Sequence, residues 1–484
     1  MLYAGIDLGT SSVKLLLCDE KGEIINAVTR EYPLSFPQEG WSEQSPEDWY
    51  DQTVKGLKEL IGGRSSELRG ISFGGQMHGL VMLDENDNVL RPAILWNDGR
   101  SAEECSYLNN DIGRDKLTEW TGNIAFPGFT APKILWVKKH EPEIFARCQK
   151  IMLPKDYLNY KLSGQFVTEP SDASGMLLFD VKNKCWSREM LEICGISVDL
   201  LPKVCDSYEC TGTLKKELAD ELGAGEVIIA PGAGDNAAAA IGMGVVGPGK
   251  CSISIGTSGT VFMTSDKFTV DSKNALHSFA HGDGSYHLMG CILSAASCIK
   301  WWMEDILNTD DYEAEQEGIN TLGENSVYFL PYLMGERSPH NDPNARGVFA
   351  GISMDTTRAE MTQAVLEGVA FALKDCVEAA SAQGIELNEA CLCGGGAKSH
   401  LWRKILANVL RLKLNIPACG EGPAYGAAIL AMVAAGEYSS VSEAAEKIVK
   451  ISGSVDYDEK LVAKYDLGYL RYKDLYLRLK SWFS

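Results

Sequence analysis

Two short turns in this sequence combine glycine with a run of hydroxyl side chains. Glycine lets the backbone approach a ligand closely, and the neighbouring amides and hydroxyls can bind phosphate oxygens. A plain hairpin turn explains either segment alone, but two such turns facing each other across a cleft would grip one triphosphate from both sides. The residues are Gly9, Thr10, Ser11 and Ser12 in the first turn, with Lys14 shortly after it, and Gly256, Thr257 and Ser258 in the second.

Two aspartates stand beside glycine turns, where a phosphoryl transfer could use them. Asp7 closes the apolar run before the first turn, and one carboxylate oxygen there can hold a hydrated Mg²⁺. Asp235 follows a glycine-rich turn at the expected start of an alanine-rich helix, so it can accept the proton of an attacking alcohol. The same helix end would stabilise phosphate charge. Taken alone, Asp235 is better explained as a helix N-cap, so a chemical role depends on the other segments.

Groups suited to a polyhydroxylated ligand follow a third apolar run, residues 70–73. Gln76, Met77 and His78 offer an amide, an apolar contact and an imidazole at one strand end. Trp96 can stack on a sugar, and Asp98 can hydrogen-bond to it. A structural histidine is the ordinary explanation of a lone His78, so neither segment is decisive by itself.

A run of three glycines, residues 394–396, follows the apolar strand expected at 390–393. Backbone without side chains lets a flat adenine ring and its ribose lie close, so Gly395, Gly396 and Ala397 are candidate nucleotide contacts. A flexible turn between a strand and a helix is the alternative. Two near matches to other nucleotide motifs fail: residues 244–251 place Cys251 where the P-loop needs Ser or Thr, and residues 232–237 lack the acidic ribose ligand of a dinucleotide fold.

The elements that must position these groups alternate between strand and helix. The N-terminus predicts three strands in a row, at 3–8, 13–18 and 23–29, and the segment Ile6–Ser11 resembles Ile253–Ser258 half a chain later. This indicates a duplicated α/β lobe. We expect lobe one at residues 1–245, lobe two at 250–440 and a helical extension at 441–484. Within lobe two, Thr357 and Glu360 predict a capping box at the start of a helix over 359–381, and a last helix is expected at 470–483.

Composition narrows the class of partner. The 484-residue chain has a net charge of −21, which argues against nucleic acid as a partner. No uncharged apolar stretch is long enough to cross a bilayer, and we expect the terminal helix to pack on the protein instead of lying on a membrane. The 14 cysteines form neither a zinc pattern nor a disulfide framework, and the start shows no signal peptide, so a cytosolic protein is expected.

Taken together, these segments resemble the FGGY family of carbohydrate kinases, and the resemblance runs from about residue 1 to 440. Residues 128–137 and 347–367 are similar to the two long family signatures. Within the family, four further segments resemble the members that phosphorylate the ketopentose D-xylulose: residues 76–79, 91–100, 153–156 and 329–341.

The resemblance implies an actin/hexokinase-like fold of two ribonuclease-H-like lobes, with sugar on lobe one, ATP on lobe two and a deep cleft between them. It implies that Asp235 is the catalytic base and that Asp7 lies at Mg²⁺ and the phosphates. A homodimer is the family's usual state. The implied sugar contacts are Gln76, Met77, His78, Trp96, Asp98 and Asn236. The implied ATP contacts are Gly9, Thr10, Ser11, Ser12, Lys14, Gly256, Thr257, Ser258, Gly395, Gly396, Ala397 and Asn408.

Two alternatives keep the lobes but change the activity. The acceptor can be another ketose, a polyol, gluconate or glycerol. More remotely, the protein can be an actin-like ATPase or a sugar sensor that phosphorylates nothing. The aspartate at 235 argues against a sensor, because a sensor needs no base.

Overall fold

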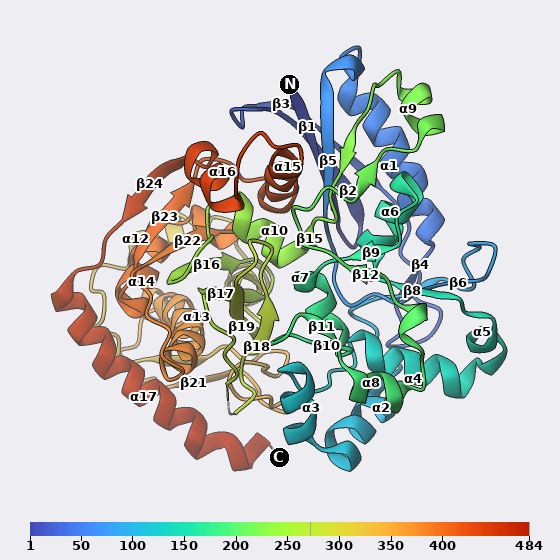
Figure 1. The fold of residues 1–484 in the computed structure, drawn as a ribbon. Helices are drawn as coiled ribbons and strands as arrows, with labels where there is room; N and C mark the ends of the chain where they lie inside the picture. The colour runs from blue at the N-terminus through green and yellow to red at the C-terminus, as the bar shows by residue number, and fades with distance from the viewer. Residues whose placement is uncertain (272, 484) are drawn as a thin grey trace.

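The chain folds into two α/β lobes joined by a pair of helices, as the computed structural model shows for residues 1–271 and 273–483 (Figure 1). The predicted fold of two related lobes is confirmed. Each lobe has a seven-stranded sheet, and the two sheets share the same arrangement of their five central strands. In both lobes the first strands along the chain pair in antiparallel fashion, and a later strand pairs parallel to the first one.

The sheet of lobe one has the order β13-β14-β5-β1-β2-β3, with the short β15 also paired to β5. β1 is antiparallel to β2 and parallel to β5, and the N-terminal hairpins predicted from the sequence are present. Helices α1 and α6 pack on this sheet through Trp49, Leu57 and Tyr157. The bounds are β1 Leu2–Leu8, β2 Ser12–Asp19, β3 Ile24–Glu31, β5 Leu68–Gly75, β13 Gly212–Thr213, β14 Ile228–Ile229, β15 Ala233–Gly234, α1 Pro46–Ile61, α6 Pro154–Ser163 and α9 Lys216–Leu222.

The sheet of lobe two has the order β18-β19-β17-β16-β22-β23-β24. Its core is formed with helices α13 and α14, and α13 begins with the predicted capping box of Thr357 and Glu360. The bounds are β16 Lys250–Ile255, β17 Gly259–Ser265, β18 His277–Ala280, β19 Tyr286–Ile292, β20 Tyr328–Leu330, β21 Val348–Ala350, β22 Glu389–Cys393, β23 Lys413–Pro417, β24 Ile451–Val455, α11 Ala296–Lys300, α12 Ala314–Glu317, α13 Arg358–Ser381, α14 His400–Leu410 and α16 Val441–Ile448.

Short elements, β4 before β5 and the others between β5 and β14, build a second layer beside lobe one, at the lower right of Figure 1. Their apolar core also takes in Phe279 and Met289 from the lobe-two sheet, so this layer touches both lobes. The bounds are β4 Glu43–Gln44, β6 Val81–Leu83, β7 Ala93–Ile94, β8 Lys150–Met152, β9 Val167–Thr168, β10 Phe179–Asp180, β11 Cys185–Trp186, β12 Lys203–Val204, α2 Ala102–Tyr107, α3 Arg114–Thr121, α4 Thr130–His140, α5 Pro142–Arg147, α7 Pro170–Ala173 and α8 Arg188–Cys194.

Helices α10 (Asp235–Gly242) and α15 (Gly422–Ala434) lie between the lobes (Figure 1). They approach so closely that a Cβ on Gly426 would lie 1.8 Å from the Ala238 carbonyl oxygen. α15 also packs on β1, where a Cβ on Gly5 would lie 1.8 Å from the Ala424 oxygen. One apolar cluster joins these helices to residues of both sheets, so the connection between the lobes is a packed core.

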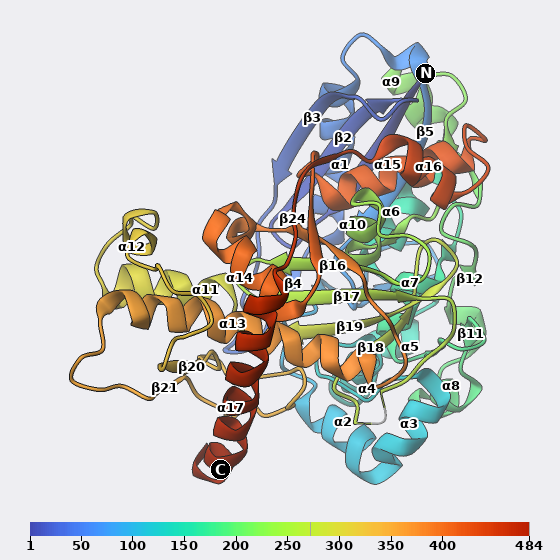
Figure 2. The ribbon, with the colours of Figure 1, turned by 90° about the vertical axis from the view of Figure 1, so that its left-hand side faces the viewer.

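The C-terminal helix α17 runs along the outside of lobe two (Figure 2) and spans Glu459–Phe483, eleven residues longer at its start than expected. Tyr465, Tyr469, Tyr472 and Tyr476 recur every three or four residues and are buried against lobe two. Within the described part of the chain, no helix is long and apolar enough to cross a membrane.

The contact between α10 and α15 predicts a loss of stability on adding one methyl group. Gly426→Ala should lower the free energy of unfolding by about 2 kcal/mol or more, because neither helix backbone can move without disturbing both lobes. Gly63→Ala is the matched control, since a Cβ there meets nothing within 4 Å. Denaturant unfolding of both variants would measure this, and equal stabilities would contradict the account.

Candidate active site

Strand register brings the two predicted aspartates to one edge of the lobe-one sheet. β1, β5 and β15 are parallel, with Asp7 opposite Gly74 and Gly75 opposite Gly234. Asp235 comes directly after Gly234 and is the first residue of α10. Asp235 is therefore not the N-cap, which is Gly234. Because the carboxyl ends of parallel strands share one edge, both carboxylates lie at the mouth of the cleft.

The hydrogen bonds of Asp235 leave one of its oxygens available. Oδ1 accepts from the backbone N–H of Asn236 at 2.7 Å and from the Asn236 side-chain amide at 2.8 Å. Within the described residues no hydrogen bond reaches Oδ2, and the side chain is half-buried. Burial raises the pKa of Asp235 to about 6, although both bonds from Asn236 lower it. A carboxylate of this kind is a stronger proton acceptor than an ordinary aspartate.

Asp7 is the second half of the pair. Burial, followed by the charge of Asp235, raises the pKa of Asp7 to about 7, and Glu421 adds to this while Lys14 opposes it. The Asp7 carboxylate makes no hydrogen bond or ion pair with any residue that the structure describes. A carboxylate whose proton affinity is raised by burial and by a neighbouring carboxylate is a place for a cation, so these residues fit Mg²⁺. Within the described chain no group of three or more metal-ligating side chains occurs, and Mg²⁺ typically needs only one or two carboxylates besides phosphate oxygens.

Hydrogen bonds to buried polar side chains fix the turn before Asp235. The Gly234 N–H donates to the Ser171 hydroxyl at 3.0 Å, and Ser171 in turn donates to Glu169 at 2.9 Å. Glu169 is fully buried with Lys155, whose ammonium bonds to Asp156 at 2.7 Å. A Cβ on Gly234 would lie 2.9 Å from the sulfur of Met77, so the absence of a side chain lets Met77 pack beside the base.

Each Gly-Thr-Ser turn is closed by a backbone hydrogen bond from its glycine, but the acceptors differ. The Gly9 N–H donates to the Ser12 carbonyl, three residues on, and the Gly256 N–H donates to the Ser258 carbonyl, two residues on, each at 3.0 Å. Ser11, Thr257 and Ser258 are exposed. Gly256 and Ser258 line a cavity of about 650 Å³ together with Asp235, Asn236 and Ala397. Residues predicted from three separate segments therefore meet in one cleft.

Lys14 reaches the cleft in an ion pair. Its ammonium lies 2.5 Å from a carboxylate oxygen of Glu421, which directly precedes α15. The two side chains are each about one-third exposed, so the pair is open to solvent and contributes little stability. An incoming anion can therefore compete with Glu421 for Lys14.

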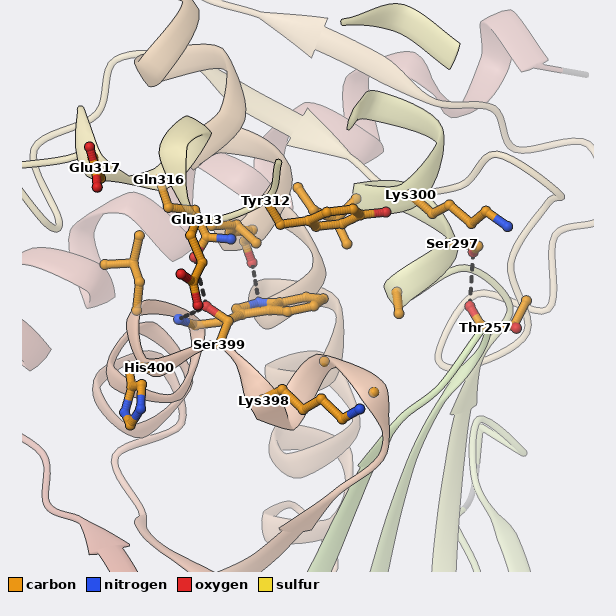
Figure 3. A pocket seen from close by; sticks show the side chains of 17 residues that line it. Thr257, Ser297, Lys300, Tyr312, Glu313, Gln316, Glu317, Lys398, Ser399 and His400 are labelled. Atoms are coloured by element: carbon orange, nitrogen blue, oxygen red, sulfur yellow. Dashed lines mark hydrogen bonds between the residues drawn. The ribbon is translucent and has the colours of Figure 1, made fainter. Parts of the chain in front are cut away.

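A second cavity, of about 810 Å³, lies on the other side of the glycine turn (Figure 3). Thr257, Gly395 and Gly396 line it, as do the apolar side chains of Ile299, Leu366 and Trp402. Figure 3 shows Lys300 and Lys398 extending toward the end where Thr257 and Ser297 lie. At the opposite end Ser399 donates to Gln316 at 2.7 Å. An apolar slot with cations at one end suits a flat base attached to phosphates.

His78 is held in an unusual backbone conformation, with φ of +70°. Its carbonyl accepts from the Thr130 hydroxyl at 3.1 Å and from the Lys133 ammonium at 2.8 Å. Lys133 is fully buried, which lowers its pKa to about 7, and it also bonds to Gly128. The segment 128–133 thus fixes the place of His78, a role that the sequence alone did not indicate.

The imidazole of His78 is neutral and oriented. Nδ1 lies 2.8 Å from the Gly175 carbonyl, which can only accept, so Nδ1 carries the proton and Nε2 is an acceptor. The ring stacks on Phe129 with centroids 4.7 Å apart. Burial lowers the pKa of His78 to about 3, outweighing the bond to Gly175. Such a ring can accept a hydrogen bond from a hydroxyl group.

The other predicted sugar contacts are more constrained. The Trp96 indole is 46% exposed and donates to the Thr10 hydroxyl at 3.0 Å, which ties it to the first phosphate turn. Asp98 is buried, and its two oxygens accept from Arg100 and from the Ser42 N–H. Asp98 is therefore occupied within the protein and lacks a free oxygen for a ligand.

Gln76 and Asn408, whose side-chain amides were predicted to contact the sugar and ATP, differ in their surroundings. Gln76 is buried and donates to Gln44 at 3.2 Å, while its own Oε1 accepts no hydrogen bond from any described residue. Asn408 lies outside both cavities: it donates to the Lys404 carbonyl and accepts from the Asp458 N–H. This placement connects α14 to the start of α17 and offers no support for an ATP contact by Asn408.

Comparisons with known proteins cover nearly the whole chain. Residues 2–242 match the N-terminal domain, and residues 251–435 the C-terminal domain, of the FGGY family of carbohydrate kinases. A xylulose kinase of Escherichia coli (strain K12) is 43% identical over 447 residues, 91% of this chain and 92% of that protein. The crystal structure of a xyloylose kinase from Brucella ovis has a TM-score of 0.95 at 40% identity, covering 99% and 100% of the two chains. A gluconate kinase from Lactobacillus acidophilus has a TM-score of 0.94 at 26% identity, covering 99% and 98%.

The His78 geometry predicts an imidazole that does not titrate in the physiological range. Since its pKa in the folded protein is about 3, the ring should stay neutral, with the proton on Nδ1, from pH 5 to pH 8. ¹⁵N NMR of histidine-labelled protein would show this, with His78→Gln used to assign the signal. A His78 titration with a midpoint near 6.5 would contradict the geometry.

Proposed function

The chain belongs to the FGGY family of carbohydrate kinases, and from that premise we propose that it transfers the terminal phosphate of ATP to D-xylulose, giving D-xylulose 5-phosphate. The observation that carries the proposal is Asp235, a half-buried carboxylate with one free oxygen, in the same cavity as the second Gly-Thr-Ser turn. A base beside a phosphate-binding turn is what alcohol phosphorylation requires. The similarity to named xylulose kinases over nine-tenths of the chain supports the choice of sugar.

The proposed arrangement divides the substrates between the lobes. Sugar lies against lobe one, with Met77 packing beside it and Nε2 of His78 accepting from a hydroxyl. The adenine base occupies the apolar cavity between Trp402 and Ile299, beside Gly395 and Gly396. The phosphates then run past Thr257 toward Asp235. The domain limits 1–245 and 250–440, with the extension 441–484, stay predictions, as do the cytosolic location and the homodimer.

The residues perform the reaction by alignment and charge. Asp235 orients the terminal hydroxyl of the ketose through Oδ2 and takes its proton as the oxygen attacks the phosphate. Amides and hydroxyls of the two turns receive the charge that develops on the phosphate oxygens, and Lys14 leaves Glu421 to join them. Asp7 would hold Mg²⁺, which supplies further charge neutralisation when bound. Closing the lobes excludes water and so limits hydrolysis of ATP.

A different acceptor on the same machinery is the second candidate. The similar fold of the gluconate kinase from Lactobacillus acidophilus favours keeping it. The catalytic apparatus around Asp235 would be unchanged, and only the contacts to the sugar would differ. In an actin-like ATPase or a sugar sensor, the Asp235 carboxylate would have no sugar hydroxyl to deprotonate.

Removing the base should abolish transfer while leaving nucleotide binding intact. Asp235→Asn should lower kcat by about 10³-fold, because it keeps the shape and loses the proton acceptor. A coupled assay of ADP release with D-xylulose, other ketoses, pentitols, gluconate and glycerol would measure turnover, and calorimetry would measure ATP affinity. The proposal fails if D-xylulose is not the preferred acceptor of the unmodified protein, or if Asp235→Asn keeps its turnover.

The pH dependence of turnover should follow the same carboxyl. With a pKa of about 6 in the free protein, Asp235 is deprotonated and active above that pH, so kcat/KM should fall about tenfold per pH unit below it. Asn236→Ala should move this acid limb to higher pH, since the hydrogen bond from the Asn236 side-chain amide lowers the pKa of Asp235. An acid limb near pH 4, or no movement in the variant, would contradict the assignment.

A further inference from the structure

Arg337 belongs to lobe two, and hydrogen bonds made by the residues before and after it fix its backbone. Glu336 accepts from the Leu293 N–H at 2.9 Å and from the Arg337 N–H at 2.8 Å. Ser338 donates its hydroxyl to the Ala275 carbonyl at 2.6 Å and accepts from the Cys291 N–H at 3.0 Å. These bonds fasten the Arg337 backbone to the end of β19, so the side chain projects from a rigid support.

The guanidinium of Arg337 has no acceptor among the residues that the structure describes. It lies over the ring of Phe126, with its carbon 5.4 Å from the ring centroid. It makes no hydrogen bond or ion pair with any residue in the described parts of the chain, although the side chain is half-buried. A guanidinium has five N–H donors, and none of those of Arg337 is used within the described residues. Donors held in place without partners are available to a ligand.

A series of aromatic rings in contact with one another connects Arg337 to His78, a residue predicted to bind the sugar. Phe126 packs 5.4 Å from Phe129, and Phe129 stacks on His78. The Arg337 charge also reaches the imidazole: it contributes to the lowered pKa of His78, after burial and the charge of Lys133. It likewise lowers the pKa of His277 on β18, second to burial. Arg337 therefore lies at the His78 end of the site.

We propose that Arg337 donates hydrogen bonds to the oxygens at the C1–C2 end of the ketose, opposite the hydroxyl that Asp235 deprotonates. This rests on the proposed function, since it assumes a ketose bound with its C5 hydroxyl at Asp235. Because Arg337 comes from lobe two and His78 from lobe one, a sugar long enough to touch both bridges the lobes. An acceptor without the C1–C2 end gains no such bridge. Arg337 thereby selects ketoses over shorter alcohols and links sugar binding to closure.

The test compares Arg337→Met, which keeps length and loses the donors, with Arg337→Lys, which keeps the charge and loses the planar fork. Arg188→Met is the control, since Arg188 is 87% exposed on the surface helix α8. For Arg337→Met we expect the KM for D-xylulose to rise about tenfold or more, with the KM for ATP changed less than twofold. Arg337→Lys should recover part of the loss, and Arg188→Met should match the unmodified protein.

Glycerol is the second acceptor to test, because it has a terminal hydroxyl but lacks the C1–C2 end of the ketose. Its turnover, or its inhibition constant against D-xylulose, should change less than threefold in Arg337→Met. The inference is overturned if the KM for D-xylulose is unchanged, if the KM values for sugar and ATP rise equally, or if glycerol is affected as much as the ketose. It is also overturned if only gluconate depends on Arg337, since that would make the arginine a carboxylate receptor. Inactivity of the unmodified protein toward every ketose would instead defeat the proposed function.

Discussion

The parallel pairing of β1, β5 and β15 is the constraint on which the site depends. It places Asp7 opposite Gly74 and Gly75 opposite Gly234, so two carboxylates from opposite ends of lobe one share a sheet edge. Only glycine permits this pairing at position 232, where a Cβ would lie 1.9 Å from the Phe73 oxygen. The same edge leads from β5 into Met77 and His78. Base, cation ligand and sugar contacts are thus consequences of one strand register.

Electrostatics explains why this edge is reactive. Burial, followed by the nearby charge of Asp235, raises the pKa of Asp7 to about 7. The whole chain carries a net charge of −21, so an anionic nucleotide must be held by local groups. Lys300 and Lys398 line the apolar cavity, and Lys14 lies near Asp7 in its pair with Glu421. The N-terminus of α10 adds its dipole at Asp235.

The sequence predicted those parts of the structure that are local. The capping box at Thr357 and the glycine turns are each read from residues that are close together in the chain, and the two-lobed fold followed from the repeat of one short local pattern and from the family resemblance. Asp235 and the turn at Gly256 could be placed in one cleft because each carries its own signal. The length of α17 was underestimated, since the tyrosines that bury its face begin at Tyr465.

Pairings between distant segments could not be predicted from the sequence. Lys14 meets Glu421 407 residues later, and Asp98 is saturated by Arg100 and the backbone of Ser42. Lys133 and Arg337 stand in segments whose composition gives no hint that one fixes His78 and the other lies unpaired near it. Such roles depend on how the second layer of lobe one meets lobe two, and that contact involves residues without sequence periodicity.

The most direct measurement is a crystal structure of the protein with D-xylulose and a non-hydrolysable ATP analogue. The account predicts Oδ2 of Asp235 within hydrogen-bonding distance of the C5 hydroxyl, in line with the terminal phosphate. A closed complex in which that carboxylate points away from the sugar, separated from it by more than one water, would contradict it.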